Sequence, residues 1–441
     1  MIPAINASNI YSTLGSNSSL VPLAIKDVAN SLGITAGSYI TGKKTESEDR
    51  FIDEFGTQIL WLGGIPFFKK LTDLTLYKLL KIDPKFDVRN FKDKEVLKVL
   101  VEKTPQNLKK SVETAIENPK FTKNLAMTKF VVSTALTVGA YLGLTKYRQH
   151  HRFEQALKEE KAKQQSALKN SAANNSETTQ NQTFQQMKEN LNKKQVNFTG
   201  GLQEFMINPV KNLMILDGVI TEERLRNSES KQEFINYAIK EGSTWGFMYF
   251  AGPIFQKFFE NRVMNKHQIP INFDSRIIES KDLDKALKNG ELNKSISQFE
   301  SLITKDTSDA EVYKFIHNNQ DNFIVKMAKK ADIIQVDKKS GAIDTRKYID
   351  IKDFKDLKDR LQKLSKASEN QEIDAFMKNV RKLKRNAIFK NMGICISALG
   401  IGVPLLMIAS RYLIPNNKEY QVAEEAKKKL AEEQKNISKL V

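Results

Sequence analysis

The stretch of sequence closest to a metal-binding motif is DGVITE, at residues 217–222, which resembles the later half of a calcium-binding EF-hand loop. Such a loop places oxygen ligands at alternating early positions, glycine at the sixth position and glutamate at the twelfth. With Gly218 as the sixth residue, the first is Leu213 and the twelfth is Arg224, and neither side chain can bind calcium. The sequence therefore predicts an ordinary turn at Gly218, with Thr221 capping the next helix.

Other residue types that carry chemistry form no recognisable site. His150 and His151 are adjacent, and neighbours on a helix point about 100° apart, so they cannot easily share a metal ion. Cys395 is the only cysteine, which excludes an intramolecular disulfide. The sequence contains no phosphate-binding loop, no dinucleotide-binding glycine pattern and no HExxH, CxxC or GxSxG motif. We therefore expect no metal and no cofactor, and we favour a non-enzymatic protein.

The chain of 441 residues is strongly basic, with a formal net charge of +18. A basic excess of this size attracts polyanions, and anionic lipid and nucleic acid are the usual two. The lysines spread along the whole chain, and the sequence lacks a groove-entering helix pattern, an aromatic RNA-binding signature and a zinc ligand set. Anionic membrane lipid is therefore favoured as a partner over nucleic acid.

Four apolar segments interrupt a polar chain whose mean hydropathy is −0.45. The strongest, residues 391–410, has about twenty residues without a charge, the length needed to cross the hydrocarbon of a bilayer. The second, residues 125–145, is interrupted only by Lys129, whose ammonium can reach the headgroups. The other two, at 55–68 and 242–259, are shorter than a usual span. The alternative is that all four are core helices of a large soluble α-helical protein.

Basic residues stand beside two of these segments, as they do where a helix leaves a bilayer. Each such residue gains on the order of 1 kcal/mol near an anionic lipid surface. The candidate lipid contacts are Lys69, Lys70, Arg381, Lys382, Lys384 and Arg385.

Each of the two short segments contains glycine close to proline. The residues are Gly63, Gly64, Pro66, Gly252 and Pro253. Such a segment forms a kinked or tilted span, a re-entrant half-helix or a buried core helix. Paired interrupted helices form the binding site of many secondary transporters. However, no charged residue lies near the centre of any of the four segments, where a coupling ion would need one.

The sequence repeats itself at a separation of about 187 residues, which predicts two related halves. Matched positions occur in the same order in both halves: Pro66 with Pro253, Phe86 with Phe273, Asp87 with Asp274, and Arg89 with Arg276. Downstream, ALTVG in the second apolar segment resembles ALGIG in the fourth. Ordered matches across dissimilar blocks favour a tandem duplication over chance similarity between lysine-rich stretches.

The repeat divides the chain into an N-terminal tail at 1–19, a first unit at 20–165, a linker at 166–204 and a second unit at 205–435. The linker is rich in Asn, Gln, Ser and Lys, so it cannot bury enough apolar surface to fold and is expected to be flexible.

An insertion at about 302–372 lengthens the second unit. We expect it to form a small α-helical or α+β domain exposed to water. Within it, residues 331–351 favour two short strands around a Lys-Lys-Ser-Gly turn.

Together these patterns predict a mainly α-helical membrane protein, built by tandem duplication of a unit with two apolar segments. The favoured function is that of an integral membrane scaffold or adaptor whose basic loops contact anionic lipid, a protein partner or another copy of the chain. A small transporter-like or channel-like protein is the first alternative, and a soluble α-helical binding protein is the second. The basic residues near the spans predict a cytoplasmic or inner membrane, with the insertion at 302–372 in the cytoplasm.

Overall fold

The computed structural model describes residues 7–15, 20–41, 44–167, 208–228, 231–304, 306–413 and 429–431. Within these ranges the chain is mainly helical, as predicted, and forms no strand. The part of the linker from residue 168 onward lies outside the described residues.

Two local predictions are wrong. The strands expected within 331–351 reduce to one antiparallel bridge between Val336 and Ile343, because Asp337 closes a tight turn by accepting hydrogen bonds from the backbone and hydroxyl of Ser340. The turn expected at 217–222 is absent, since these residues lie inside the helix α9 (Pro209–Arg226), which is capped by Asn208. Asn208 accepts from the backbone of the first helical turn and so places the helix start upstream of the expected cap.

The described chain divides into two compact units, and each draws on both halves of the sequence. The mixed unit comprises residues 1–25, 69–131 and 250–395, and the bundle unit comprises residues 26–68, 132–249 and 396–441. Several helices continue from one unit into the other: α2 (Val21–Thr41), α3 (Lys44–Thr72), α6 (Pro119–Ala167), the π-helix η4 (Trp245–Ala251) and α18 (Ile373–Ser397).

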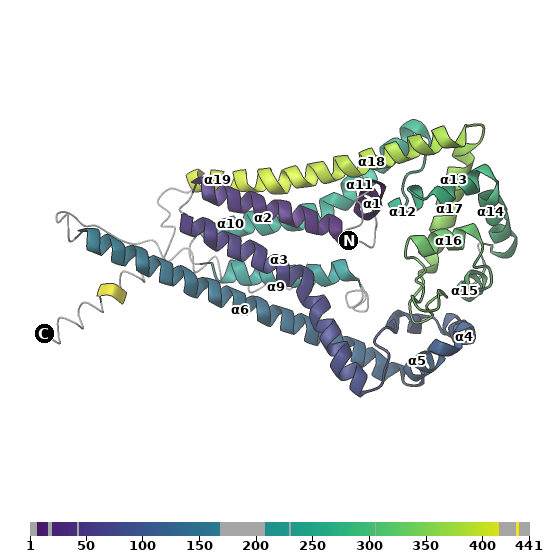
Figure 1. Ribbon diagram of the computed structural model, residues 1–441, viewed down its shortest axis with the longest axis horizontal. Coiled ribbons are helices and arrows are strands. Elements are labelled where there is room, and N and C mark those ends of the chain that lie inside the picture. Colours follow the sequence, from purple (N-terminus) through teal and green to yellow (C-terminus); the bar gives the residue numbers. More distant parts are fainter. Residues whose placement is uncertain are drawn as a thin grey trace. The chain divides into compact units, whose positions relative to one another are not determined.

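Most helices of the mixed unit are short (Figure 1). The buried apolar side chains of this unit form one hydrophobic core. Leu100, Val112, Leu283 and Phe354 are completely or almost completely buried in that core. Its helices are α1 (Ala7–Leu14), η1 (Asp73–Tyr77), η2 (Val88–Lys92), α4 (Lys94–Lys103), α5 (Gln106–Glu117), α11 (Gly252–His267), α12 (Ser275–Ile278), α13 (Lys281–Lys288), α14 (Glu291–Leu302), α15 (Asp309–Asn318), α16 (Phe323–Lys330) and α17 (Ile351–Ser368).

Side-chain caps explain why these short helices begin where they do. Asp93 accepts hydrogen bonds from the backbone at the start of α4, and Asp350 does the same for α17. Ser308 and Glu311 form a reciprocal capping box at the start of α15. The expected insertion at 302–372 therefore folds as α15, α16 and α17, and its apolar residues join the core of this unit.

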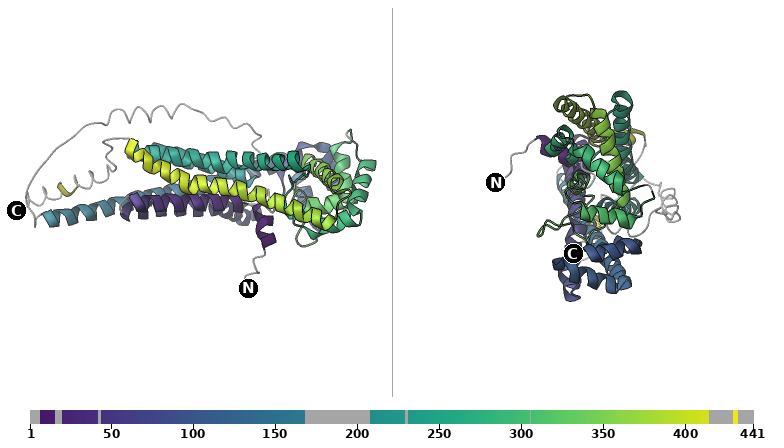
Figure 2. Two further views of the ribbon diagram at one scale, coloured as in Figure 1. Left: turned by 90° about the horizontal axis from the view of Figure 1, so that it is seen from above. Right: turned by 90° about the vertical axis from the view of Figure 1, so that its right-hand side faces the viewer.

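The bundle unit contains helices that run alongside one another (Figures 1 and 2). It is formed by α9, α10 (Lys231–Thr244), the π-helix η5 (Ala398–Gly402), α19 (Val403–Leu413) and parts of α2, α3 and α6. Helix α3 runs antiparallel to α6, because Asp53 pairs with Arg148 at one level and Gly64 lies against Thr137 at another.

Glycine allows two of these helices to approach closely. An added Cβ on Gly33 of α2 would lie 2.1 Å from the carbonyl oxygen of Gly400, and one on Gly37 would lie 3.3 Å from Pro404. Small residues four positions apart are a common device for tight packing between helices. Helix α2 therefore packs in parallel against η5 and α19.

By length and composition, two helical stretches in the described chain could cross a membrane: Pro119–Lys163 and Ile373–Ser410. They contain the two strongest apolar segments of the sequence, residues 125–145 and 391–410.

Candidate functional site

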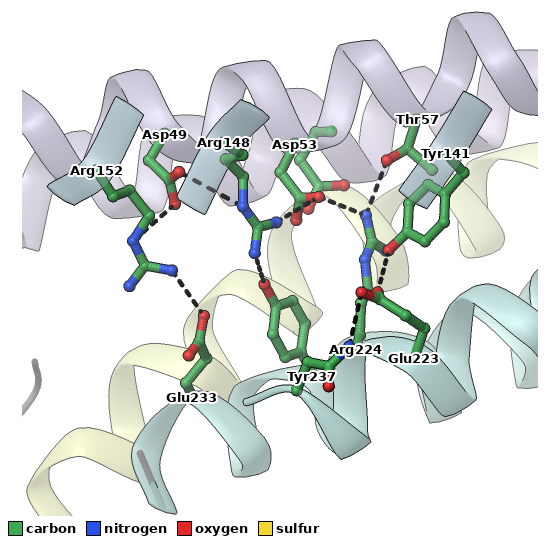
Figure 3. Close-up of polar contacts among 12 residues, drawn as sticks. Asp49, Asp53, Thr57, Tyr141, Arg148, Arg152, Glu223, Arg224, Glu233 and Tyr237 are labelled. Atoms are coloured by element: carbon green, nitrogen blue, oxygen red, sulfur yellow. Dashed lines mark hydrogen bonds and ion pairs between the residues drawn. The ribbon is translucent and has the colours of Figure 1, made fainter. Parts of the chain in front are cut away.

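Charged side chains fill part of the interior of the bundle unit (Figure 3). The first layer joins α3 and α6. Arg148 lies 2.6 Å from Asp53 and 3.5 Å from Asp49, and Arg152 lies 3.7 Å from Asp49. The four residues are spaced at i and i+4 on both helices, which places the acids on one face of α3 and the bases on the facing side of α6.

The second layer brings in α9 and α10. Arg224 of α9 donates to Asp53 at 2.9 Å and to Glu241 at 2.5 Å. Lys240 of α10 lies 2.8 Å from Glu54 and 3.3 Å from Glu241. These contacts connect helices from the two halves of the sequence.

Aromatic and acidic side chains of α6, α9 and α10 complete this layer (Figure 3). The hydroxyl of Tyr237 accepts a hydrogen bond from Arg148 at 3.0 Å, and Tyr141 donates to Glu223 at 2.9 Å. The guanidinium of Arg224 lies 5.7 Å from the centre of the Tyr237 ring and 6.0 Å from that of Tyr141, within cation–π distance. At the outer end of the network, Arg152 donates to Glu233 at 3.2 Å.

The charged side chains of this network are buried, so the loss of one partner affects the others. The side chains of Asp53 and Arg224 are each 3% exposed, and that of Arg148 is 7% exposed. A buried charge is tolerated only when it is paired and hydrogen-bonded, because its desolvation costs several kcal/mol. The residues of the network therefore depend on one another.

A small cavity of about 30 Å³ lies at the inner end of the network. Its volume is enough for roughly one or two water molecules. Its ionisable lining consists of Asp27, Glu54, Asp217, Arg224, Lys240 and Glu241. The cavity is too small for an organic substrate, so only water, a proton or a very small ion can occupy it.

Neutral polar groups beside the cavity extend the network towards α2. Asn30 donates to Thr244 at 3.2 Å, and Ser31 accepts from Gln58 at 2.7 Å while donating to Glu54.

Asp217 accepts a hydrogen bond from Tyr249, which lies in the π-helix η4. The wider turn of a π-helix re-aims side chains and occurs frequently at functional sites. Here it faces the cavity, because Met248 of the same segment is one of the lining residues.

The structure places three of the six predicted lipid contacts in intramolecular ion pairs of the mixed unit. Arg381 lies 2.5 Å from Asp284, Lys384 lies 2.6 Å from Glu260, and Arg385 lies 2.6 Å from Glu279. Lys70 and Lys382 are exposed, and the ammonium of Lys69 lies 6.0 Å from the centre of the Phe130 ring.

The glycine–proline positions differ between the halves. Gly63, Gly64 and Pro66 lie within α3, which continues past the proline to Thr72. Gly252 and Pro253 instead open α11, directly after the π-helix η4. Proline is well suited to that position, because the first turn of a helix has no partner for its backbone N–H.

The paired Asp-x-Arg motifs of the two halves form the same turn. Asp87 accepts from the backbone nitrogen of Arg89 at 2.9 Å and from its guanidinium at 3.1 Å. Asp274 accepts from Arg276 in the same two ways, at 2.9 Å and 3.0 Å.

A third turn of this kind, between Asp344 and Arg346, was missed in the sequence. Arg346 also donates a hydrogen bond to Asp83 at 2.7 Å. Burial by itself would raise the pKa of Asp83, but its hydrogen bonds and the charge of Arg346 outweigh burial and lower that pKa below its ordinary value. Asp87 and Asp274 cap the helices η2 and α12, and none of the three turns supplies a lining residue of the cavity in the bundle unit.

Sequence reasoning also missed the buried network. The available signal was the i, i+4 spacing of Asp49 with Asp53 and of Arg148 with Arg152. The same spacing is common on solvated helix faces, so it does not distinguish a buried network from an exposed one.

Within the described residues, no group of three or more His, Cys, Asp or Glu side chains is arranged to hold a metal ion. No protein-family model matches the chain, and no curated protein and no solved structure matches it either.

Proposed function

We propose that the chain is an integral membrane protein, and that its bundle unit provides a transporter-like or channel-like pathway for small ions. The observation that carries this proposal is the distribution of polarity. Ion pairs occupy the interior of the bundle unit, while large apolar side chains face outward from its helices: Ile40, Ile59, Ile401 and Leu405 are 78%, 73%, 62% and 58% exposed. Single exposed apolar residues are ordinary in a soluble protein, but several large ones on the helices of one bundle suit a surface that a bilayer covers.

The location of the charges supports the ion pathway. Ionisable residues inside a membrane bundle are costly and typically mark ion or proton routes. The network extends from Arg152, beyond the apolar part of α6, to Asp217, which pairs with a tyrosine inside the apolar segment 242–259. It thus joins one end of the apolar region to the cavity.

The helix directions limit how the bundle can be inserted. Helix α6 runs antiparallel to α10, because Arg148 contacts Tyr237 and Arg152 contacts Glu233. Helix α9 runs antiparallel to α10 and η4, because Arg224 contacts Glu241 and Asp217 contacts Tyr249, so α6 and α9 point the same way. Their connection, residues 168–207, is rich in Asn, Gln, Ser and Lys and is not suited to crossing hydrocarbon. We therefore assign the spans to α3, α6, α10–α11 and α18–α19, with α9 inserted among them from the linker side.

A tandem duplication is consistent with this arrangement. Helices α2, α3 and α6 of the first half correspond in order to α9, α10–α11 and α18–α19 of the second. The capped turns at Asp87 and Asp274 occupy matching places between the second and third helices of each set. A duplicated unit of this kind places two copies of each helix around one polar interior.

The proposal is tested in two steps. Carbonate extraction of membranes that contain the full chain should leave it in the pellet, and release into the supernatant would refute membrane integration. The chain reconstituted in liposomes should then carry proton, sodium or potassium flux above that of protein-free liposomes. An integrated protein with no flux of any of these ions would overturn the ion pathway alone.

A membrane scaffold or adaptor is the second candidate. The observation that favours it is the exposed trio Lys382, Phe389 and Lys390, next to the apolar segment 391–410. Basic and aromatic residues at that position suit contact with anionic headgroups. This role is compatible with an ion pathway, because it uses a different part of the chain.

A further inference from the structure

The cavity of the bundle unit has more acids than bases. Four carboxyl groups line it, from Asp27, Glu54, Asp217 and Glu241, but only two basic groups do, from Lys240 and Arg224. An uncompensated carboxylate in a low-dielectric interior is strongly disfavoured, and it becomes neutral by taking up a proton when no cation is at hand.

The two basic groups are already engaged. Lys240 lies between Glu54 and Glu241, and Arg224 lies between Glu241 and Asp53. In the described part of the chain, neither Asp27 nor Asp217 forms an ion pair with a lysine or arginine. These are therefore the two carboxyl groups that the bases of the cavity leave unneutralised.

A second observation is independent of the acids. Asn30 is completely buried and lines the cavity. Its amide nitrogen donates to Thr244, and its amide oxygen has no hydrogen-bond partner among the described residues. A buried carbonyl without a donor is destabilising, because it has lost its hydrogen bonds to water and gained none in the protein. A water molecule in the cavity, or a protonated carboxyl group, would supply the missing donor.

We propose that this cavity is a proton-binding site, in which Asp27 and Asp217 take up a proton from a hydronium ion that reaches the cavity. The inference rests on the proposed function and names the proton as its ion. In the binding step a proton adds to a carboxylate oxygen and gives a neutral carboxyl group, and release reverses the step. The only bond that breaks is an O–H bond of the hydronium ion, which leaves as water.

The surroundings of the two acids suit this chemistry. The charged or titratable groups facing them are Glu54 of α3, Arg224 of α9, Lys240 and Glu241 of α10 and Tyr249 of η4. Tyr249 donates to Asp217 and orients that carboxyl group. A metal ion fits less well, because no group of three acidic or histidine side chains within the described ranges converges as a metal site requires.

The test uses the full chain in liposomes and infrared difference spectra recorded between about pH 8 and about pH 6, in water and in heavy water, because exposed carboxyl groups stay ionised over this range. The native protein should show the carbonyl stretch of a protonated carboxyl group that shifts on deuteration. That band should weaken or disappear in Asp27→Asn and in Asp217→Asn. The matched control is Asp356→Asn, on the exposed face of α17, which should retain it.

Proton flux, followed with a pH-sensitive dye inside the same liposomes, should fall at least tenfold in each of the two cavity variants. Asparagine has the shape of aspartate, and circular dichroism identifies a variant that does not fold, in which case the other variant carries the test. Absence of the band from the native protein, or its persistence in the cavity variants, overturns the site.

The two proposals fail in different ways. A band that is lost in the variants, with flux at the level of protein-free liposomes, supports the proton site and overturns the ion pathway. Flux that is equal in the native protein and both cavity variants supports the pathway and overturns this site.

Discussion

The guanidinium of Arg224 lies 2.9 Å from the carboxylate of Asp53, although the two residues are 171 positions apart in the sequence. Both side chains are almost fully buried. The pair therefore joins α9 of the second half to α3 of the first through a contact that has no access to water.

Replacing Arg224 by methionine should destabilise the bundle unit by about 3–5 kcal/mol, because Asp53 and Glu241 lose a buried partner. Unfolding monitored by circular dichroism in detergent measures the loss. The matched control is Arg226→Met, since Arg226 lies one half-turn away on the same helix and is 59% exposed in its ion pair with Glu222. Its replacement should change stability by less than about 1 kcal/mol. Equal effects of the two substitutions would contradict the buried network.

Replacing Gly33 by alanine should destabilise the protein by about 1–3 kcal/mol, because the new methyl group would meet the backbone of Gly400. Thermal unfolding in detergent provides the measurement. The control is Gly139→Ala, where an added Cβ meets nothing within 4 Å. This control should be neutral or slightly stabilising, since alanine favours the helix more than glycine does. A Gly33→Ala variant as stable as the control would exclude the close packing of α2 against η5.

Lower pH should weaken the mixed unit through His317. Burial, with help from Lys103 and Lys329, lowers the pKa of His317 to about 4. The unfolded chain therefore takes up a proton near pH 6.5 while the folded unit does not, so stability is full above pH 6.5 and falls as the pH drops towards 4. The loss should be about 2 kcal/mol between pH 7 and pH 5.

Denaturant unfolding at the two pH values tests this prediction. In the variant His317→Gln, the free energy of unfolding should change less between pH 7 and pH 5, because the imidazole that titrates is absent. His267 is exposed, so His267→Gln should behave as the native protein does. A native protein equally stable at both pH values would show that His317 is not the group responsible.

Cysteine labelling should reveal which parts of the chain share a side of the membrane. In a Cys395→Ser background, probes at Ser111 and Ser340 should label alike and opposite to a probe at Ser176. The reason is that α3 and α10–α11 run in one direction and α6 and α18–α19 in the other. The probe at Ser340 should be shielded from an impermeant reagent in intact cells, as expected for a cytoplasmic insertion. Labelling of Ser340 and Ser176 from the same side would refute the four-span assignment.

Binding of the protein to anionic lipid should depend on the exposed lysines beside the apolar segment 391–410. Replacing Lys382 or Lys390 by glutamine should weaken binding to vesicles containing phosphatidylserine about fivefold each, with the effect reduced at high salt. Lys352→Gln, on the exposed surface of α17, is the matched control. Arg381, Lys384 and Arg385 are poorer targets, because their replacement also breaks ion pairs within the mixed unit. Binding that ignores both salt and lipid charge would remove lipid from the proposed partners.

The local pattern of the sequence was sufficient to predict the mainly helical fold and the two strongest apolar helices. Residues 125–145 and 391–410 lie within the two helical stretches that could cross a membrane. Hydrophobic content and length are properties of a single segment, so they can be recognised without knowing what surrounds it. The prediction of strands within 331–351 was wrong because a local pattern is not enough there. A β-pattern over a few residues does not reveal that Asp337 closes the turn after one bridge.

The buried network was decided only by the tertiary structure. Lys26 and Asp27 lower the mean hydropathy of α2, so its sequence does not stand out as an apolar segment. Both residues nevertheless belong to a helix that packs closely against η5 through Gly33. A charged residue is equally compatible with a solvated helix face and with a buried ion pair, and the choice depends on whether an opposite charge meets it from another helix. For Asp53 those charges come from Arg148 and Arg224, on helices far along the chain. Only the folded bundle brings them within hydrogen-bonding distance, because desolvation makes the pairing favourable only when all partners are in place.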